Sequence, residues 1–129
     1  MAATKRTIKQ SYLATHIIAE LFGCQKIDNL KFVDQSLKEA AHICGATVLH
    51  TKLHKFSPQG ITGYVLLAES HISVHTWPEY GYAAADIFSC GTSFRPREAA
   101  NKLAEALECR NPEIREIARG LAIKEAVGL

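Results

Sequence analysis

Residues 68–91 read AESHISVHTWPEYGYAAADIFSCG, and this stretch predicts two strands joined by a tight turn. The side chains alternate over residues 71–77, which is the period of a strand with one buried face. One face carries Ile72, Val74 and Thr76, and the other carries His71, Ser73, His75 and Trp77. Pro78 ends this strand, the next residues turn the chain, and residues 82–89 form the second strand. Because the connection is short, the two strands are expected to pair antiparallel.

Further strands are expected on the N-terminal side of this hairpin. Residues 46–56 and 61–68 are interpreted as two strands joined by Ser57-Pro58-Gln59-Gly60, because Pro and Gly together are typical of a turn. Residues 12–22 are rich in large apolar side chains and are interpreted as a strand, with a helix as the competing interpretation.

Helices are expected in three places. Apolar residues recur at spacings of three and four over residues 30–44, after a possible cap at Asp28-Asn29 and before a terminating Gly45. A second helix is expected to begin near Arg95-Pro96. Asn111-Pro112-Glu113 has the pattern of another helix start, a cap followed by Pro in the first turn.

These elements predict an α+β fold in a single domain of residues 1–129. The expected architecture is a two-layer sandwich in which an antiparallel sheet carries the helices on one face. The composition, 47% hydrophobic and 22% charged, is ordinary for a globular protein. A net charge of +2 with interspersed signs gives no indication of a nucleic-acid or membrane partner. No apolar run is long enough to span a membrane, and no apolar segment follows the basic N-terminus to form a secretory signal.

The cysteines are expected to be reduced thiols in a cytoplasmic protein. They lie at positions 24, 44, 90 and 109, and no pair has Cys-x-x-Cys spacing. Cys24, Cys44 and Cys109 are expected to be small core residues. Cys90 differs because it lies within the 68–91 stretch, together with the polar residues of that stretch.

Ser70, His75 and Cys90 place a hydroxyl, an imidazole and a thiol close together in the sequence. Taken singly, Ser70 would be a turn residue and His75 a satisfied core histidine. The four-residue spacing of His71 and His75, with Cys90, also raises a zinc site, but a set with no second cysteine is weak for structural zinc. No metal is therefore predicted.

The longer pattern around these residues is specific. The run Glu69–Glu79, followed by Gly81–Ala84 and Asp86–Gly91, resembles the prokaryotic S-adenosylmethionine decarboxylase proenzymes. The resemblance covers residues 12 to 107 and fades beyond them, where many relatives have a strand and this chain is expected to be helical. It includes three shorter matches, His16…Ala19-Glu20, Gly45-Ala46-Thr47 and Phe56…Pro58…Gly60.

The resemblance implies a chain that cleaves itself between Glu69 and Ser70, giving a β chain of residues 1–69 and an α chain of residues 70–129. Ser70 would become a covalent pyruvoyl group, whose ketone forms a Schiff base with the substrate amine and accepts the electrons of decarboxylation. The implied substrate is S-adenosylmethionine, and its decarboxylated product would serve spermidine and polyamine synthesis. A cytoplasmic homodimer of processed protomers is expected.

The resemblance also assigns roles to the remaining residues. Ser70 would attack the carbonyl before it, and Thr62, where relatives generally carry Ser, would donate to the oxyanion. His75 would be the processing base, and Cys90 the proton donor in decarboxylation. The substrate-binding residues would be a stacking pair, Phe56 and Trp77, and a carboxylate for the ribose hydroxyls, Glu79.

Two alternatives remain open at this point. Pyruvoyl chemistry suits other amino acids, so a decarboxylase of arginine or ornithine is one, although Phe56, Trp77 and Glu79 would then lose their purpose. An uncleaved, inactive paralogue that regulates an active subunit is the other, although such a protein would be expected to lack Ser70, His75 or Cys90.

Overall fold

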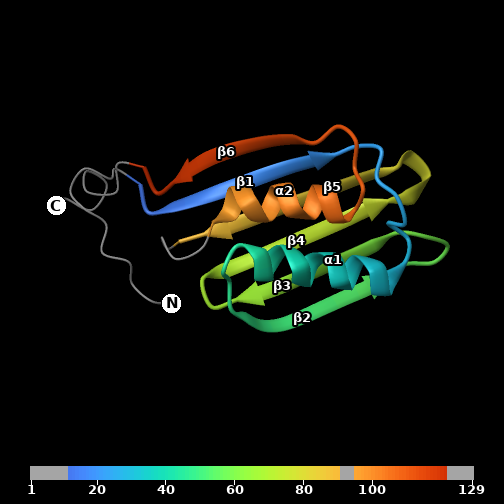
Figure 1. Cartoon of the computed structure of the whole chain (residues 1–129), viewed down its shortest axis with the longest axis horizontal. Coiled ribbons are helices and arrows are strands. Elements are labelled where there is room, and N and C mark those ends of the chain that lie inside the picture. The colour runs from blue at the N-terminus through green and yellow to red at the C-terminus, as the bar shows by residue number, and fades with distance from the viewer. Residues whose placement is uncertain (1–11, 91–94, 122–129) are drawn as a thin grey trace.

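The computed structural model describes residues 12–90 and 95–121, which form one antiparallel sheet with both helices on the same face (Figure 1). The sheet has the strand order β2-β3-β4-β5-β1-β6. The elements are β1 (Ala14–Leu21), α1 (Leu30–Ile43), β2 (Val48–Lys55), β3 (Ile61–Leu67), β4 (Ser70–Trp77), the 3-10 turn η1 (Pro78–Tyr80), β5 (Tyr82–Ser89), α2 (Pro96–Ala106) and β6 (Glu113–Arg119). The predicted α+β two-layer sandwich is confirmed.

Strand β4 lies inside the sheet, paired with β3 on one side and β5 on the other. Its alternation follows the prediction, since Ile72 and Val74 are fully buried beneath the helices while His75 and Trp77 are exposed. The side of the sheet that carries His75 and Trp77 is called here the helix-free face. This alternation decides which side chains of the central strands are available for chemistry.

Both helices bury small and branched side chains against the sheet. The Asn29 side chain caps α1 by accepting from the backbone N–H of Phe32 at 3.0 Å, as predicted. Leu37 on α1 and Leu103 on α2 are fully buried. Alanines make up much of the remaining inner faces and let the helices approach the sheet and each other closely. No helix of the described residues is long and apolar enough to cross a membrane.

The helix expected after Asn111-Pro112 is wrong, because residues 113–119 form strand β6. It pairs antiparallel with β1, for example with Ile117 opposite His16. Without β6, the backbone groups along this side of β1 would be an unpaired edge. The local cap-and-proline signal is therefore overridden by tertiary pairing, and the β-branched Ile114 and Ile117 suit a strand.

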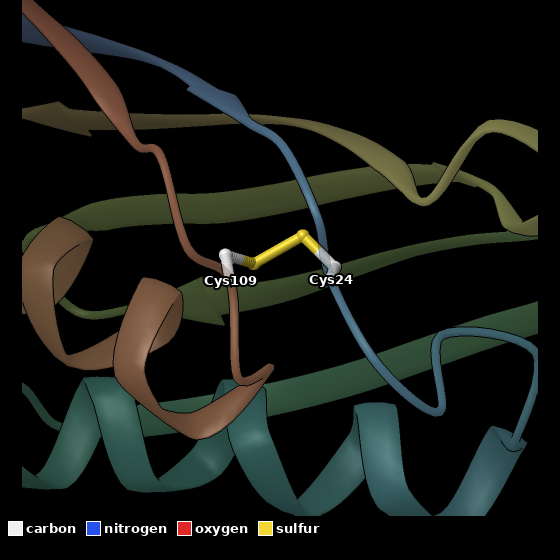
Figure 2. Close-up of a disulfide and its surroundings, with 2 residues drawn as sticks. All are labelled: Cys24 and Cys109. Carbon is white, nitrogen blue, oxygen red and sulfur yellow. A yellow bond between two sulfur atoms is a disulfide. The ribbon is translucent and has the colours of Figure 1, made fainter.

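The expectation that all four cysteines are reduced is also wrong. Cys24 and Cys109, separated by 85 positions, form a disulfide (Figure 2). Cys44 is a buried free thiol, as expected of a small core residue, and burial raises the pKa of this thiol. The two half-cystines had no recognisable spacing because the fold, and not the local sequence, brings them together.

Candidate functional site

Five of the predicted site residues line one pocket of about 360 Å³. The pocket lies where β3 begins, where β4 ends and where η1 turns the chain. Its predicted site residues are Phe56, Thr62, His75, Trp77 and Glu79. The rest of the lining comes from Gln59, Gly60, Ile61 and Thr76. The structure thus brings together residues that are up to 23 positions apart, from Phe56 to Glu79.

Thr62 and His75 form a hydrogen-bonded pair in this pocket. They are directly opposite each other in the β3–β4 register, and Thr62 Oγ1 lies 3.0 Å from His75 Nδ1. When Nδ1–H donates to the hydroxyl, Nε2 is left unprotonated and the hydroxyl proton can be given to another oxygen. That tautomer supplies a base and a donor side by side, which are the two processing roles predicted for these residues.

The aromatic residues of the pocket present open ring surfaces. Phe56 is 47% exposed and Trp77 is 40% exposed, although both are large and apolar. Trp77 also contacts the ring of Tyr82, with centroids 5.3 Å apart. Glu79 is placed in η1 by Pro78 at its first position and by Gly81, which ends the turn in a left-handed conformation. Open rings beside a carboxylate can bind a planar cationic ligand with hydroxyl groups.

Burial, together with a hydrogen bond to Glu20, raises the pKa of Tyr82 to about 12. The Tyr82 hydroxyl donates to Glu20 Oε1 at 2.6 Å. This phenol therefore stays protonated at neutral pH, and its ring is fixed behind Trp77.

The predicted cleavage point lies at the other end of β4. Ser70 is the first residue of the strand and pairs with Ser89 of β5. The Cys90 thiol donates to the backbone carbonyl of Glu69 at 3.2 Å. The Glu69 carboxylate accepts from the backbone N–H of Thr47 at 3.3 Å, which ties the cleavage point to the start of β2. A hydrogen-bond donor thus already points at the carbonyl oxygen that self-cleavage would charge.

Within one chain, the Thr62–His75 pair of the pocket lies far from Ser70 at the predicted cleavage point. Ser70 and His75 are five residues apart on one strand, a span of about 16 Å at the usual rise of a strand. Thr62 lies beside His75 and therefore at the same distant end.

Asp86 organises a second polar cluster that the sequence did not reveal. His16 Nε2 lies 2.6 Å from Asp86 Oδ2, His71 Nε2 lies 3.2 Å from the same oxygen, and Ser73 donates to Oδ1. Arg119 donates to His16 Nδ1 at 2.9 Å, so this imidazole bridges Arg119 and Asp86. The cluster spans β1, β4, β5 and β6 on the helix-free face.

The charges of this cluster are strongly coupled. Burial alone opposes ionisation of Asp86, but the hydrogen bonds from His71, Ser73 and His16 outweigh it and hold its pKa well below the usual range. The hydrogen bond to Asp86 raises the pKa of His71. His71, whose role the sequence left open, is therefore a partner of Asp86. Alternation placed His71 and Ser73 on one face, but nothing in the sequence pointed to a carboxylate on the neighbouring strand.

Among residues 12–90 and 95–121, no group of three or more His, Cys, Asp or Glu side chains is arranged to hold a metal ion. The zinc interpretation of His71, His75 and Cys90 has no geometric support there, since His71 is bound to Asp86 and Cys90 contacts Glu69. Gly91, which ends the sequence motif, lies outside the described residues.

Known proteins are similar to this chain in both sequence and fold. The family model for S-adenosylmethionine decarboxylase matches residues 15–120. An S-adenosylmethionine decarboxylase proenzyme from Methanococcus vannielii is 47% identical over 117 residues, 89% of this chain and 96% of the relative. A relative of the same name from Thermoanaerobacter pseudethanolicus is 42% identical over 111 residues, 84% of this chain and 90% of the relative.

A solved structure gives the same result. The adenosylmethionine decarboxylase from Aquifex aeolicus superimposes with a TM-score of 0.79 at 34% identity, covering 87% of this chain and 94% of the other. With this fold and these relatives, the chain is an enzyme of the decarboxylase class. It belongs to the S-adenosylmethionine decarboxylase family, as the motif at residues 69–91 predicted.

Proposed function

We propose that this chain is a proenzyme that cleaves itself between Glu69 and Ser70 and then decarboxylates S-adenosylmethionine. The products of cleavage are residues 1–69 and residues 70–129. The observation that carries the proposal is the Phe56–Thr62–His75–Trp77–Glu79 pocket, which combines open aromatic rings and a carboxylate with a hydroxyl–imidazole pair. Family membership and the names of the relatives support the same reaction.

The residues around the Glu69–Ser70 bond suit self-cleavage. The Ser70 hydroxyl attacks the Glu69 carbonyl carbon, so that an ester C–O bond forms and the peptide C–N bond breaks. Charge develops on the Glu69 oxygen, to which the Cys90 thiol already donates at 3.2 Å. Thr62 is the further oxyanion donor, and His75 accepts the α-proton of Ser70 when the ester is eliminated. Water then replaces the nitrogen of residue 70, which leaves as ammonia.

The pyruvoyl group formed from Ser70 supplies the carbonyl that captures the substrate amine and accepts the electron pair of the lost carboxylate. The Cys90 thiol lies beside residue 70 and returns a proton to the substrate α-carbon. Phe56 and Trp77 stack on the adenine and attract the sulfonium charge, and Glu79 accepts from the ribose hydroxyls.

This site needs two copies of the chain. Since Thr62 and His75 lie about 16 Å along the strand from Ser70 of the same chain, they act on the Ser70 of a partner. A two-fold axis that places one β4 end for end on another would complete both sites. Large apolar residues suited to such an interface are exposed on the helix-free face, at Tyr64 (40%), Leu66 (43%) and Ile117 (44%).

Co-expression of two defective chains tests the shared site. Ser70→Ala and His75→Ala homodimers are both expected to stay uncut. In a mixed dimer, the His75→Ala chain keeps its own Ser70 and receives His75 from the partner, so that this chain is cut. A size tag on one chain identifies which is cleaved. Absence of cleavage in the mixed dimer would contradict the shared site, while cleavage in the wild type alone would still support self-processing.

Substrate choice is tested with carboxyl-labelled S-adenosylmethionine, arginine and ornithine in parallel. Release of labelled CO₂ from S-adenosylmethionine supports the proposal, because only this substrate uses the rings of Phe56 and Trp77 and the Glu79 carboxylate. Release from arginine or ornithine alone would overturn it. Mass spectrometry under reducing conditions separates the enzyme from an inactive regulator, since a regulator stays at 14.2 kDa.

The product is proposed to supply the aminopropyl group of spermidine synthesis, and no nucleic-acid or membrane partner is proposed. A cytoplasmic location stays a prediction. The Cys24–Cys109 disulfide removes the support that four reduced cysteines would have given to this location. The remaining support is that polyamine synthesis is a cytoplasmic process.

A further inference from the structure

Self-cleavage would turn this sheet into an assembly of two interleaved chains. Residues 1–69 contain β1, β2 and β3, whereas residues 70–129 contain β4, β5 and β6. In the strand order β2-β3-β4-β5-β1-β6, the β1 strand of the first chain lies between β5 and β6 of the second. Three of the strand pairs, β3–β4, β5–β1 and β1–β6, would therefore join different chains.

The disulfide lies across this same division. Cys24 follows β1 and belongs to the segment 1–69, and Cys109 follows α2 and belongs to the segment 70–129. Figure 2 shows the two side chains pointing toward each other from these two connections, with the sulfur–sulfur bond between them. No other cysteine takes part in this disulfide, because Cys44 and Cys90 are both thiols.

The two connections are held together independently of the sulfur atoms. The backbone N–H of Gln25 donates to the carbonyl of Leu107 at 3.0 Å, and the N–H of Arg110 donates to the carbonyl of Phe22 at 2.9 Å. These bonds flank the disulfide on both sides. Cys24 is only 7% exposed, so the pairing occurs inside a folded contact between the two connections.

We propose that Cys24–Cys109 is the covalent bond that joins the two products of self-cleavage, so that the processed protomer remains a single linked molecule. The proposal rests on the proposed self-cleavage. In forming the bond, the two thiols give up two protons and two electrons. A low-molecular-weight disulfide is the acceptor and is reduced to two thiols. A dithiol reverses the reaction and releases the two chains from each other.

The bond matters most when the processed protein unfolds. Two chains joined by the disulfide stay together after unfolding. Each chain then experiences the other at an effective concentration of about 1 mM, the value typical of short tethers. Unlinked chains must meet in solution. At about 1 µM protein, refolding of the linked form is therefore favoured up to ~1000-fold over refolding of separate chains.

The direct test compares denaturing gels with and without reductant. Purified enzyme is equilibrated in a glutathione and glutathione-disulfide mixture, and its free thiols are then blocked with N-ethylmaleimide. We expect a single species of the size of the whole chain without reductant and two fragments with dithiothreitol. Two fragments in both lanes would overturn the link. One uncut chain in both lanes would instead overturn self-cleavage, so the two failures are distinguishable.

Substitutions identify the bond. Cys24→Ser and Cys109→Ser are each expected to give two fragments without reductant, whereas Cys44→Ala, which removes a free buried thiol, keeps the linked species. A linked species in Cys24→Ser would overturn the assignment. After refolding from urea at about 1 µM, Cys24→Ser is expected to recover at least ~10-fold less activity than the oxidised wild type. Equal recovery would overturn the proposed role of the bond.

Discussion

Replacing Asp86 by Asn is expected to lower the free energy of unfolding more than neutralising a single surface charge would. The change keeps the size of the side chain but removes the charge that His16, His71 and Ser73 contact. Asp86 is 26% exposed, so solvent screens part of each interaction. Hydrogen bonds to a charged group contribute roughly 1.5–3 kcal/mol each, and the new amide retains some of them as an acceptor. We expect a net loss of about 2 kcal/mol.

The pH dependence of this loss follows from the two shifted groups. The pKa of Asp86 is lowered, so its contribution is present above the unfolded carboxyl value of about 3.9 and is lost as pH falls through the lower folded value. The pKa of His71 is raised, so its contribution is complete below the unfolded value of about 6.5 and is lost as pH rises through the higher folded value. The difference between wild type and Asp86→Asn is therefore expected to be largest near pH 5–6 and smaller at pH 9.

Urea unfolding of uncleaved Ser70→Ala protein at a fixed concentration measures this effect on one intact chain. A loss of about 2 kcal/mol lowers the urea midpoint by about 1 M if the slope is near 2 kcal/mol per M. Asp34→Asn is the matched control, because Asp34 pairs with Lys38 at 2.9 Å on an exposed turn of α1 and should shift stability by less than ~0.5 kcal/mol. Equal midpoints for the two variants, or a difference that does not change with pH, would refute the reasoning.

Three further changes test other parts of the molecule. Thr62→Ala is expected to slow self-cleavage by about 100-fold through loss of an oxyanion donor, whereas Thr62→Ser keeps the hydroxyl and cleaves at nearly the wild-type rate, as followed on reducing gels. Trp77→Ala is expected to raise KM for S-adenosylmethionine about tenfold while cleavage proceeds normally, and an unchanged KM would remove Trp77 from substrate binding. Leu37→Ala leaves a cavity beneath α1 and is expected to cost about 2–5 kcal/mol in urea unfolding, with no change in KM.

The sequence predicted those parts of the fold that local pattern controls. The alternation over residues 71–77 and the turn at Pro78 gave the β4–β5 hairpin, and the spacing of apolar residues from Leu30 to Cys44 gave α1. The region after Asn111 was mistaken because its cap-and-proline pattern is a helix signal over a few residues. Its real partner is β1, about a hundred positions earlier, and the pattern of one segment carries no information about an unpaired edge elsewhere.

The polar cluster around Asp86 and the disulfide were also missed because their partners lie far apart in the sequence. Asp86 contacts His16 from 70 positions away, and Cys24 meets Cys109 across 85 positions. Both pairs depend on β1 lying between β5 and β6, which follows from the topology of the whole sheet. The pocket residues were easier to predict, because Thr62 and His75 belong to consecutive strands of one meander and alternation already places each on a face.

Ser70 and His75 show how closeness in the sequence can suggest the wrong geometry. Five positions in sequence look like proximity, and in a helix they would be little more than one turn. In a strand the same five positions span about 16 Å. The observed extension of β4 from Ser70 to Trp77 therefore argues against attack and proton transfer within one chain. In the proposed two-copy site, a second copy turned end for end would bring its His75 to the Ser70 of the first, so the length of β4 would set how the two copies are offset.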